Sequence, residues 1–148
     1  LSRTRAVCPA VEEHYTAAAW QEFAEQLDYL VLALPLTSDT HQVVNEAVLS
    51  VMKEDAWVVN VGRGDLIDET ALLEALLNGK LGGAILDVFS QEPLPANHAF
   101  WKLPNVYVTP HLSGPSQVDG VAHFFVRNFR RYESGGELVG VVDAARGY

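Results

Sequence analysis

The stretch AWVVNVGRGDLID, Ala56–Asp68, places a strand, a glycine-flanked arginine and a helix start in direct succession. Its first residues form a short apolar run rich in valine, which predicts a buried strand over Ala56–Val61. The run breaks at Gly62-Arg63-Gly64, and Asp68 then stands where the N-cap of a helix over Glu69–Asn78 belongs. A strand that ends in such a turn and leads into a helix is typical of the ligand-binding edge of an open α/β sheet.

Arg63 has two interpretations at this point. The planar guanidinium can grip a carboxylate with two parallel hydrogen bonds and keeps its charge at any physiological pH, so it suits an anion-binding crevice. The alternative is a surface arginine in a Gly-rich turn, since most loop arginines face water.

Composition and charge narrow the class of protein. The chain has 148 residues, 49% of them hydrophobic and 20% charged, which describes one ordinary globular domain. Its net charge of -9 argues against a nucleic-acid partner, and no apolar run is long enough to cross a membrane. The single cysteine, Cys8, excludes an internal disulfide framework and a multi-cysteine metal site, so no metal and a reducing, cytoplasmic compartment are expected.

Further strands and helices alternate along the chain. Buried strands are predicted over Tyr29–Leu34, Gly83–Val88 and Asn105–Thr109, and helices over Glu12–Leu27, Thr40–Leu49 and Val118–Tyr132. This alternation predicts an α/β fold with a mostly parallel sheet and helices on both faces. The tail after Gly135-Gly136 has no clear partner inside the chain.

Polar residues follow the predicted strands at their carboxyl ends, where open α/β sheets bind ligands. Arg63, Asp87 and His111 each come just past a strand, and Glu92 lies in the long loop between the last two. A histidine beside a carboxylate could give or take the proton of a hydroxyl group, and an arginine could bind an anionic substrate and polarise its carbonyl.

Three segments in this order resemble the signature blocks of the D-isomer-specific 2-hydroxyacid dehydrogenase family. They are VNVGRGDLID (Val59–Asp68), LGGAILDVFSQEPLP (Leu81–Pro95) and NVYVTPHLSGPS (Asn105–Ser116). LVLALPLTSDT (Leu30–Thr40) is similar to the strand and turn that precede them, and the FWKLPNV and VVDAARGY segments resemble the glyoxylate/hydroxypyruvate reductase branch. The implied fold is part of a Rossmann-like, doubly wound sheet.

The resemblance implies a catalytic set and a cofactor-binding set. Arg63 would grip the substrate, His111 would donate the proton in the reduction of a small 2-oxo acid, and Glu92 would hydrogen-bond His111. Asp87 with Val61, Gly62, Arg63, His111, Ser113 and Gly114 would face the nicotinamide, and Leu34, Pro35 and Leu36 would border the adenosine half, with Thr40 capping the helix behind them.

The first residues bear on the choice between NAD and NADP. Ser2-Arg3-Thr4-Arg5 would fall where the second strand of the dinucleotide fold ends, and an acidic residue there selects the ribose 2′-hydroxyl of NAD. This segment has Ser and Arg and no acid, which favours NADP(H), with Ser2, Arg3 and Thr4 as contacts. The alternative is that these are ordinary loop cations.

The sequence also departs from the family pattern. It contains no G-x-G-x-x-G, so the phosphate-binding turn and the first βα unit are expected to be missing, as is the substrate domain. Residues 1–137 would form a partial dinucleotide-binding domain, and residues 138–148 a tail that packs on the absent domain. The chain alone is therefore expected to be inactive, and its complete protein to be a homodimeric reductase.

Other functions stay open. A non-catalytic, corepressor-like member could keep this fold, although the presence of Arg63, Glu92 and His111 together argues against it. A dehydrogenase for formate or phosphoglycerate would need the substrate domain to be distinguished. His14, His41 and His98 are expected to be solvated residues of polar loops or helix starts.

Overall fold

The computed structural model describes residues 10–114 and 116–145. Contacts within the chain divide it into two compact units, one ending at His111 and one beginning at Leu112. The boundary falls after the last strand, whereas the division into residues 1–137 and 138–148 concerns function and stays a prediction.

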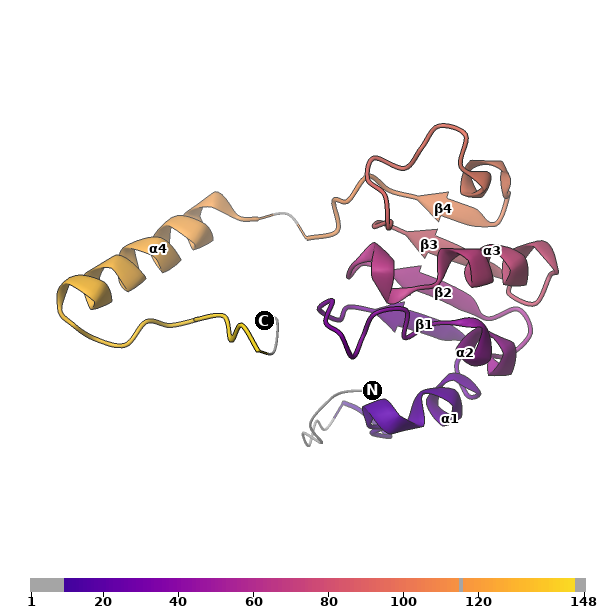
Figure 1. Ribbon diagram of the computed structural model, residues 1–148, viewed down its shortest axis with the longest axis horizontal. Coiled ribbons are helices and arrows are strands. Elements are labelled where there is room, and N and C mark those ends of the chain that lie inside the picture. The colour runs from indigo at the N-terminus through magenta and orange to yellow at the C-terminus, as the bar shows by residue number, and fades with distance from the viewer. Residues whose placement is uncertain (1–9, 115, 146–148) are drawn as a thin grey trace. The chain divides into compact units, whose positions relative to one another are not determined.

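A parallel four-stranded sheet forms the centre of the first unit. Its strands β1 (Tyr29–Leu32), β2 (Trp57–Asn60), β3 (Gly83–Leu86) and β4 (Val106–Val108) lie in the order β1-β2-β3-β4 (Figure 1). All three pairings are parallel, so each connection returns across the sheet. The predicted α/β fold is confirmed, and each predicted strand is present, though shorter by one to two residues at one or both ends.

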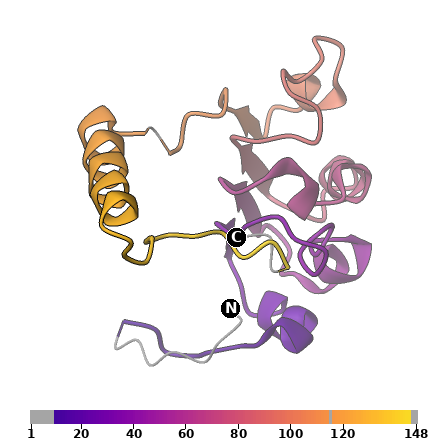
Figure 2. The same ribbon diagram turned by 60° about the vertical axis from the view of Figure 1, so that its left-hand side comes forward.

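The three α-helices in the described residues of this unit cover one face of the sheet. Figure 2 shows α1 (Trp20–Ala24), α2 (Glu46–Val51) and α3 (Glu69–Leu77) on the same side of it. Strands that follow one another in one direction through right-handed crossovers place their helices on a single face, and only a reversal of strand order covers both. Helices on both faces therefore remain a prediction beyond what the first unit shows.

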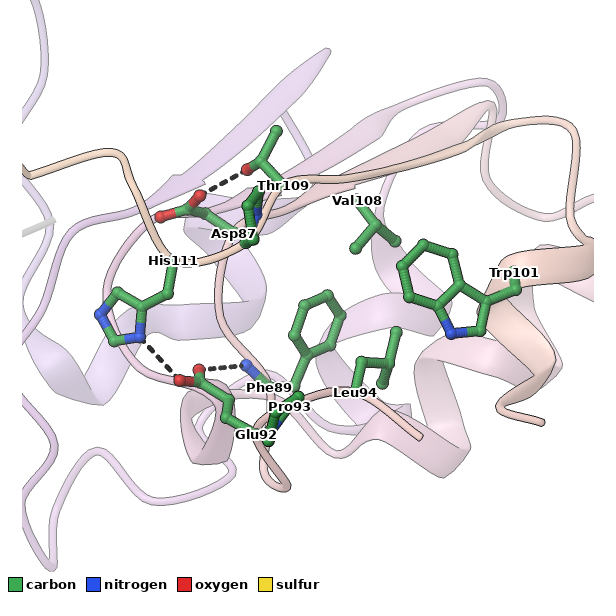
Figure 3. A pocket seen from close by; sticks show the side chains of 10 residues that line it. Asp87, Phe89, Glu92, Pro93, Leu94, Trp101, Val108, Thr109 and His111 are labelled. Atoms are coloured by element: carbon green, nitrogen blue, oxygen red, sulfur yellow. Dashed lines mark hydrogen bonds and ion pairs between the residues drawn. The ribbon is translucent and has the colours of Figure 1, made fainter. Parts of the chain in front are cut away.

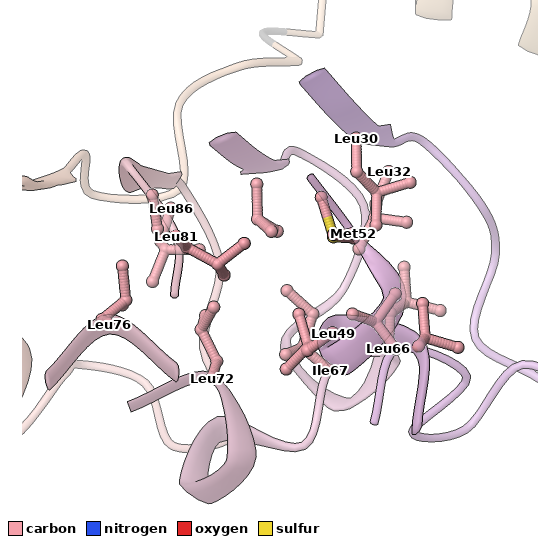
Figure 4. Close-up of a cluster of buried hydrophobic side chains, with 14 of the residues drawn as sticks. Leu30, Leu32, Leu49, Met52, Leu66, Ile67, Leu72, Leu76, Leu81 and Leu86 are labelled. Atoms are coloured by element: carbon pink, nitrogen blue, oxygen red, sulfur yellow. The ribbon is translucent and has the colours of Figure 1, made fainter. Parts of the chain in front are cut away.

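Buried and exposed side chains alternate along β1, as expected for a sheet covered by helices on one face. Leu30 and Leu32 of β1 are buried, whereas Tyr29 and Val31 are 64% and 60% exposed. The core lies between the sheet and the helices (Figure 4) and consists mainly of leucine and valine, with Met52 and Phe100 among its largest fully buried side chains.

The first helical region is much shorter than Glu12–Leu27. It consists of a 3-10 turn, η1 (Ala17–Ala19), and α1, so the predicted start at Glu12 is wrong. The predicted apolar face is confirmed: Ala24 is buried, and Trp20, Phe23 and Leu27 pack against the core.

Helix α2 begins later than predicted, and Thr40 is not its cap. The backbone of Gln42 and Val44 is held by the segment after β2: their amides donate to Asp65 O and Leu66 O at 2.7 and 3.0 Å. This pairing prevents a helix from starting at Thr40, and Asn45 caps α2 by accepting from the Val48 amide. Thr40 instead closes a turn, because its hydroxyl donates to the Pro35 carbonyl at 2.8 Å.

Helix α3 follows the prediction closely. The Asp68 carboxylate accepts from the amides of Thr70 and Ala71 at 3.0 and 3.1 Å, as an N-cap does. Gly79 follows the helix with φ +68°, a conformation that favours glycine and ends the helix.

The second unit is built on one amphipathic helix, α4 (Val118–Glu133), whose described side chains are all at least partly exposed. The start of the tail pairs with this helix: Asn128 donates to Val139 O and accepts from Val139 N, and Arg131 donates to Glu137 O at 3.0 Å. The expectation that the tail lacks a partner in the chain is therefore wrong for its first residues, since the Asn128 amide offers a matched donor and acceptor.

Candidate active site

The ends of the four strands gather the candidate residues at one edge of the sheet. Leu34–Leu36 follow β1, Val61–Arg63 follow β2, Asp87 follows β3 and His111 follows β4 by a few residues. Parallel strands end at the same edge, so the clustering follows from the topology.

Asn60 holds the turn that carries Arg63. It is the last residue of β2 and only 1% exposed; its amide donates to Arg63 O at 2.9 Å and accepts from Gly62 N at 3.0 Å. Sequence reasoning did not single out this residue. The available signal was a polar side chain at the end of an otherwise apolar strand, where a buried amide needs partners.

Gly64 brings the same turn against the loop that follows β3. A Cβ at this position would lie 1.9 Å from the Phe89 carbonyl carbon and 2.3 Å from the Ser90 nitrogen. Only glycine allows this approach. The Gly62-Arg63-Gly64 turn and the loop that carries Glu92 therefore pack backbone to backbone.

Arg63 itself is exposed at this edge. One guanidinium nitrogen donates to the neighbouring Gly62 carbonyl at 2.7 Å. A guanidinium has five N–H donors, so this bond leaves others that can bind an anion. The exposure is compatible with both interpretations of Arg63, the anion clamp and the solvated loop cation.

Asp87 and His111 are tied to each other through the backbone. The Asp87 side chain is 2% exposed and accepts from the Thr109 hydroxyl, and the His111 amide donates to Asp87 O at 2.9 Å. His111 adopts φ +51°, a left-handed conformation that costs a residue with a Cβ about 1 kcal/mol. Such strain is common where a side chain must be aimed at a ligand.

Glu92 and His111 form a direct pair. His111 Nδ1 lies 2.7 Å from Glu92 Oε2, and the other carboxylate oxygen accepts from the Phe89 amide at 2.9 Å (Figure 3). An ionised carboxylate only accepts, so Nδ1 carries the proton and Nε2 is the ring nitrogen that points away from Glu92. The predicted contact between Glu92 and His111 is present.

The pair borders a largely apolar pocket of about 520 Å³. Figure 3 shows Phe89, Leu94, Trp101 and Val108 lining it on the side away from His111 Nε2. Asp87, Glu92 and His111 supply its ionisable groups, and Arg63 is not among its lining residues.

The surroundings of Glu92 favour its charged form. The hydrogen bond from His111 lowers the pKa of Glu92, and the hydrogen bond from the Phe89 amide adds to this effect. Partial burial acts in the opposite direction, and the charges of His111 and Arg63 lower the pKa further. Glu92 is therefore a carboxylate at neutral pH, able to orient His111 and to stabilise its protonated ring.

The residues expected to bind the cofactor lie in different parts of the chain, and only some of them are at the carboxyl edge of the sheet. Val61 is 38% and Leu36 37% exposed at the edge, and the Leu34 backbone lies against Gly62, where a Cβ would be 2.9 Å from Leu34 O. Ser113 and Gly114 belong to the second unit, and Ser2, Arg3 and Thr4 lie outside the described residues.

The chemistry of this edge fits the nicotinamide end of a dinucleotide. It combines exposed apolar side chains, which suit a ring, with the Asp87 carboxylate, which suits an amide donor.

The expectation of solvated histidines is wrong for His14 and His98. The Nε2 atom of His14 is buried, and His98 Nδ1 accepts from the Phe100 amide at 3.3 Å, capping the 3-10 helix η3 (Ala99–Lys102). In the described part of the chain, no three acidic, histidine or cysteine side chains are grouped as metal ligands. No helix there is long and apolar enough to cross a membrane.

A parallel sheet that gathers a histidine–carboxylate pair and an exposed arginine at the carboxyl ends of its strands is typical of α/β proteins that bind their ligands at that edge. Residues 2–113 match the family described as D-isomer specific 2-hydroxyacid dehydrogenase, NAD binding domain. The chain belongs to this family of oxidoreductases, as the three sequence blocks predicted.

Two similar proteins carry the name glyoxylate/hydroxypyruvate reductase. Glyoxylate/hydroxypyruvate reductase A from Salmonella paratyphi B is 38% identical over 147 residues, which are 99% of this chain and 47% of that protein. The NADPH-dependent glyoxylate/hydroxypyruvate reductase of Sinorhizobium meliloti, solved with NADP and sulfate, is 41% identical with a TM-score of 0.92, over 99% of this chain and 48% of that one.

A third similar structure is a D-isomer specific 2-hydroxyacid dehydrogenase from Xanthobacter autotrophicus in complex with NADPH and MES. It is 37% identical with a TM-score of 0.94, and the match covers 99% of this chain and 61% of that one. The chain spans about half the length of the curated relatives it matches.

Proposed function

We propose that this chain supplies the proton donor and the substrate-binding arginine of an NADPH-dependent reductase that converts a small 2-oxo acid, glyoxylate or hydroxypyruvate, to its D-2-hydroxy acid. The observation that carries the proposal is the 2.7 Å contact between His111 and Glu92 at the carboxyl edge of a parallel sheet. The names of the relatives support the choice of substrate.

Each residue has a separate task. His111 would protonate the carbonyl oxygen through Nε2, and Glu92 would hold Nδ1–H and stabilise the charged ring. Arg63 would bind the substrate carboxylate and polarise the carbonyl. Asp87, Val61, Gly62, Ser113 and Gly114 would hold the nicotinamide, which supplies the hydride when bound.

A kinetic experiment on the complete polypeptide that contains this chain tests the assignment. Reduction of glyoxylate and hydroxypyruvate is followed by the loss of NADPH absorbance, with His111→Gln and the matched control His123→Gln, an exposed histidine of α4. We expect His111→Gln to lower kcat by about 10²–10⁴-fold and His123→Gln to leave it unchanged. A wild-type protein that binds NADPH but turns over neither acid would instead favour the non-catalytic, corepressor-like alternative.

The preference for NADP(H) rests on Arg3 and on the nucleotides bound to two similar structures. Arg3→Glu should raise KM for NADPH about tenfold or more, because it removes a charge-assisted contact to the 2′-phosphate, while KM for NADH should not rise, because an acidic residue can accept from the ribose 2′-hydroxyl. Equal effects on both cofactors would show that Arg3 is an ordinary loop cation.

We expect activity to depend also on the substrate domain of the complete protein. We propose that the 148-residue chain alone is inactive, that the complete protein acts in the cytoplasm as a homodimer, and that the tail packs on the substrate domain. NADPH-dependent reduction of glyoxylate by the purified chain would contradict the first point.

A further inference from the structure

The carboxylate of Glu69 connects helix α3 to both ends of the loop that carries Glu92. Its Oε1 accepts from the Ser90 amide at 2.8 Å, and its Oε2 lies 4.0 Å from His98 Nε2. The side chains of Glu69 and His98 are only 22% and 25% exposed, so these contacts are partly shielded from water.

The geometry of His98 sets which of its nitrogens carries the proton. Nδ1 accepts from the Phe100 amide at 3.3 Å and is therefore unprotonated in the neutral ring. The proton then lies on Nε2, the nitrogen that faces Glu69. At 4.0 Å the two atoms lie beyond hydrogen-bond distance, so this contact is weaker than the one to the Ser90 amide.

Neighbouring amides of the loop link Glu69 to the histidine–carboxylate pair. The Ser90 amide is held by Glu69, and the adjacent Phe89 amide donates to Glu92 at 2.9 Å. Gly64 packs against the peptide between them. We therefore expect a shift of Ser90 to displace the neighbouring Phe89 amide, which fixes one oxygen of the carboxylate that orients His111.

We propose that Glu69 is a positioning residue for the Glu92–His111 pair. It acts on the pair through the Ser90 amide, and its other carboxylate oxygen lies near His98 at the far end of the loop. This inference rests on the proposed reductase function for its kinetic effect. Its structural content, the fixed position of Glu92, stands without it.

A different explanation for an acidic residue here is the favourable charge at a helix N-terminus. Glu69 is the first residue of α3, immediately after its cap. Glu46 is the first residue of α2 in the same relation to Asn45. Glu46→Gln therefore removes the same charge at a helix start and provides the matched control.

The test compares Glu69→Ala, Glu69→Gln and Glu46→Gln in the complete polypeptide, with kcat expressed per NADPH-binding site. We expect Glu69→Ala to lower kcat about 10–100-fold with KM for the 2-oxo acid changed less than about twofold, because the pair is misplaced while Arg63 is untouched. Glu69→Gln keeps an acceptor for the Ser90 amide and should restore most of the loss. Glu46→Gln should behave as wild type.

A second readout needs no catalysis. In carboxyl-selective NMR titrations, loss of the Phe89 contact should raise the pKa of Glu92 in Glu69→Ala relative to wild type and to Glu46→Gln. The charged groups that act on Glu92 are His111 and Arg63, and neither is altered in these variants.

The outcomes separate the two proposals. Wild-type protein without reductase activity, together with a raised pKa of Glu92 in Glu69→Ala, would reject the proposed function and keep the positioning role. An active enzyme in which Glu69→Ala and Glu46→Gln have equal kcat, or in which the pKa of Glu92 does not change, would reject the role of Glu69. His98→Asn keeps the cap of η3 but is too short to reach Glu69, and should show a smaller loss of the same kind.

Discussion

The ionisation state of Glu92 determines whether its pair with a charged His111 is stable. The hydrogen bonds from His111 and the Phe89 amide lower its pKa, so the carboxylate persists to more acid pH than an ordinary glutamate. The pair is intact above that lowered pKa and is lost as pH falls through it, because a protonated carboxyl can no longer hold a charged His111.

Glu92→Gln should therefore change both the rate and its pH dependence. We expect kcat of the complete polypeptide to fall at least about tenfold at neutral pH, since a neutral amide orients the ring but does not stabilise its charge. The acid limb of the rate profile that Glu92 causes should disappear. Rates measured across the acid range check this, and an acid limb identical to wild type would assign it to another group.

Gly64 is expected to tolerate no side chain. In Gly64→Ala the added Cβ meets the Phe89 and Ser90 backbone at 2.3 Å or less, so the loop must move. We expect a loss of about 1–3 kcal/mol in the free energy of unfolding, measured by urea titration of the chain. Gly120→Ala is the control, because a Cβ there meets nothing closer than 3.9 Å and alanine favours a helix.

The sequence predicted those site residues whose placement follows from topology. Asp87 and His111 come straight after strands, so their common edge could be inferred. Asn60 was missed although its partners are two and three residues away, because a polar residue that ends an apolar strand was given no weight. Gly64 and Glu69 were missed because their partners are distant in sequence: Glu69 and Ser90 are 21 residues apart, and no local pattern encodes that contact. The anion clamp of Arg63 stays a prediction, since its observed partner is the carbonyl beside it.

Helix ends that are set by residues close in sequence were predicted well. Asp68 and Gly79 mark the two ends of α3. Asp68 does so through hydrogen bonds to nearby amides and Gly79 through its backbone preference, and a sequence shows both directly. The start of α2 could not be predicted in this way. The amides of Gln42 and Val44 are taken by a segment more than 20 residues away, so tertiary pairing overrides the local preference near Thr40.

The cap of α3 gives a prediction at this scale. Asp68→Ala removes the acceptor of two amides and should lower the free energy of unfolding by about 1 kcal/mol, with most of the effect restored in Asp68→Asn. Urea unfolding followed by circular dichroism measures it. Equal stability of Asp68→Ala and wild type would show that water replaces the cap at no cost.

For the whole molecule, the strand order decides which surface is left for other contacts. The row Val31, Val59, Ile85 and Tyr107 runs across all four strands in register on the face opposite α1–α3. Val31 and Tyr107 are 60% and 59% exposed, and Trp57 stacks on Tyr107 with ring centres 6.0 Å apart. This row therefore lies outside the hydrophobic core, although its side chains are apolar.

Replacing valine by threonine should change the free energy of unfolding very little on the exposed face of the sheet and lower it on the buried face. Val31→Thr on the exposed row should leave the stability of the chain within about 0.5 kcal/mol of wild type and reduce the fluorescence of a bound hydrophobic dye. Val58→Thr on the neighbouring strand buries a hydroxyl where the side chain is 0% exposed, and should cost about 1–3 kcal/mol. Urea unfolding and dye titration of both variants test the pair. A destabilising Val31→Thr would mean that this row is already packed in the isolated chain, and dye binding unchanged by Val31→Thr would place the accessible apolar surface elsewhere.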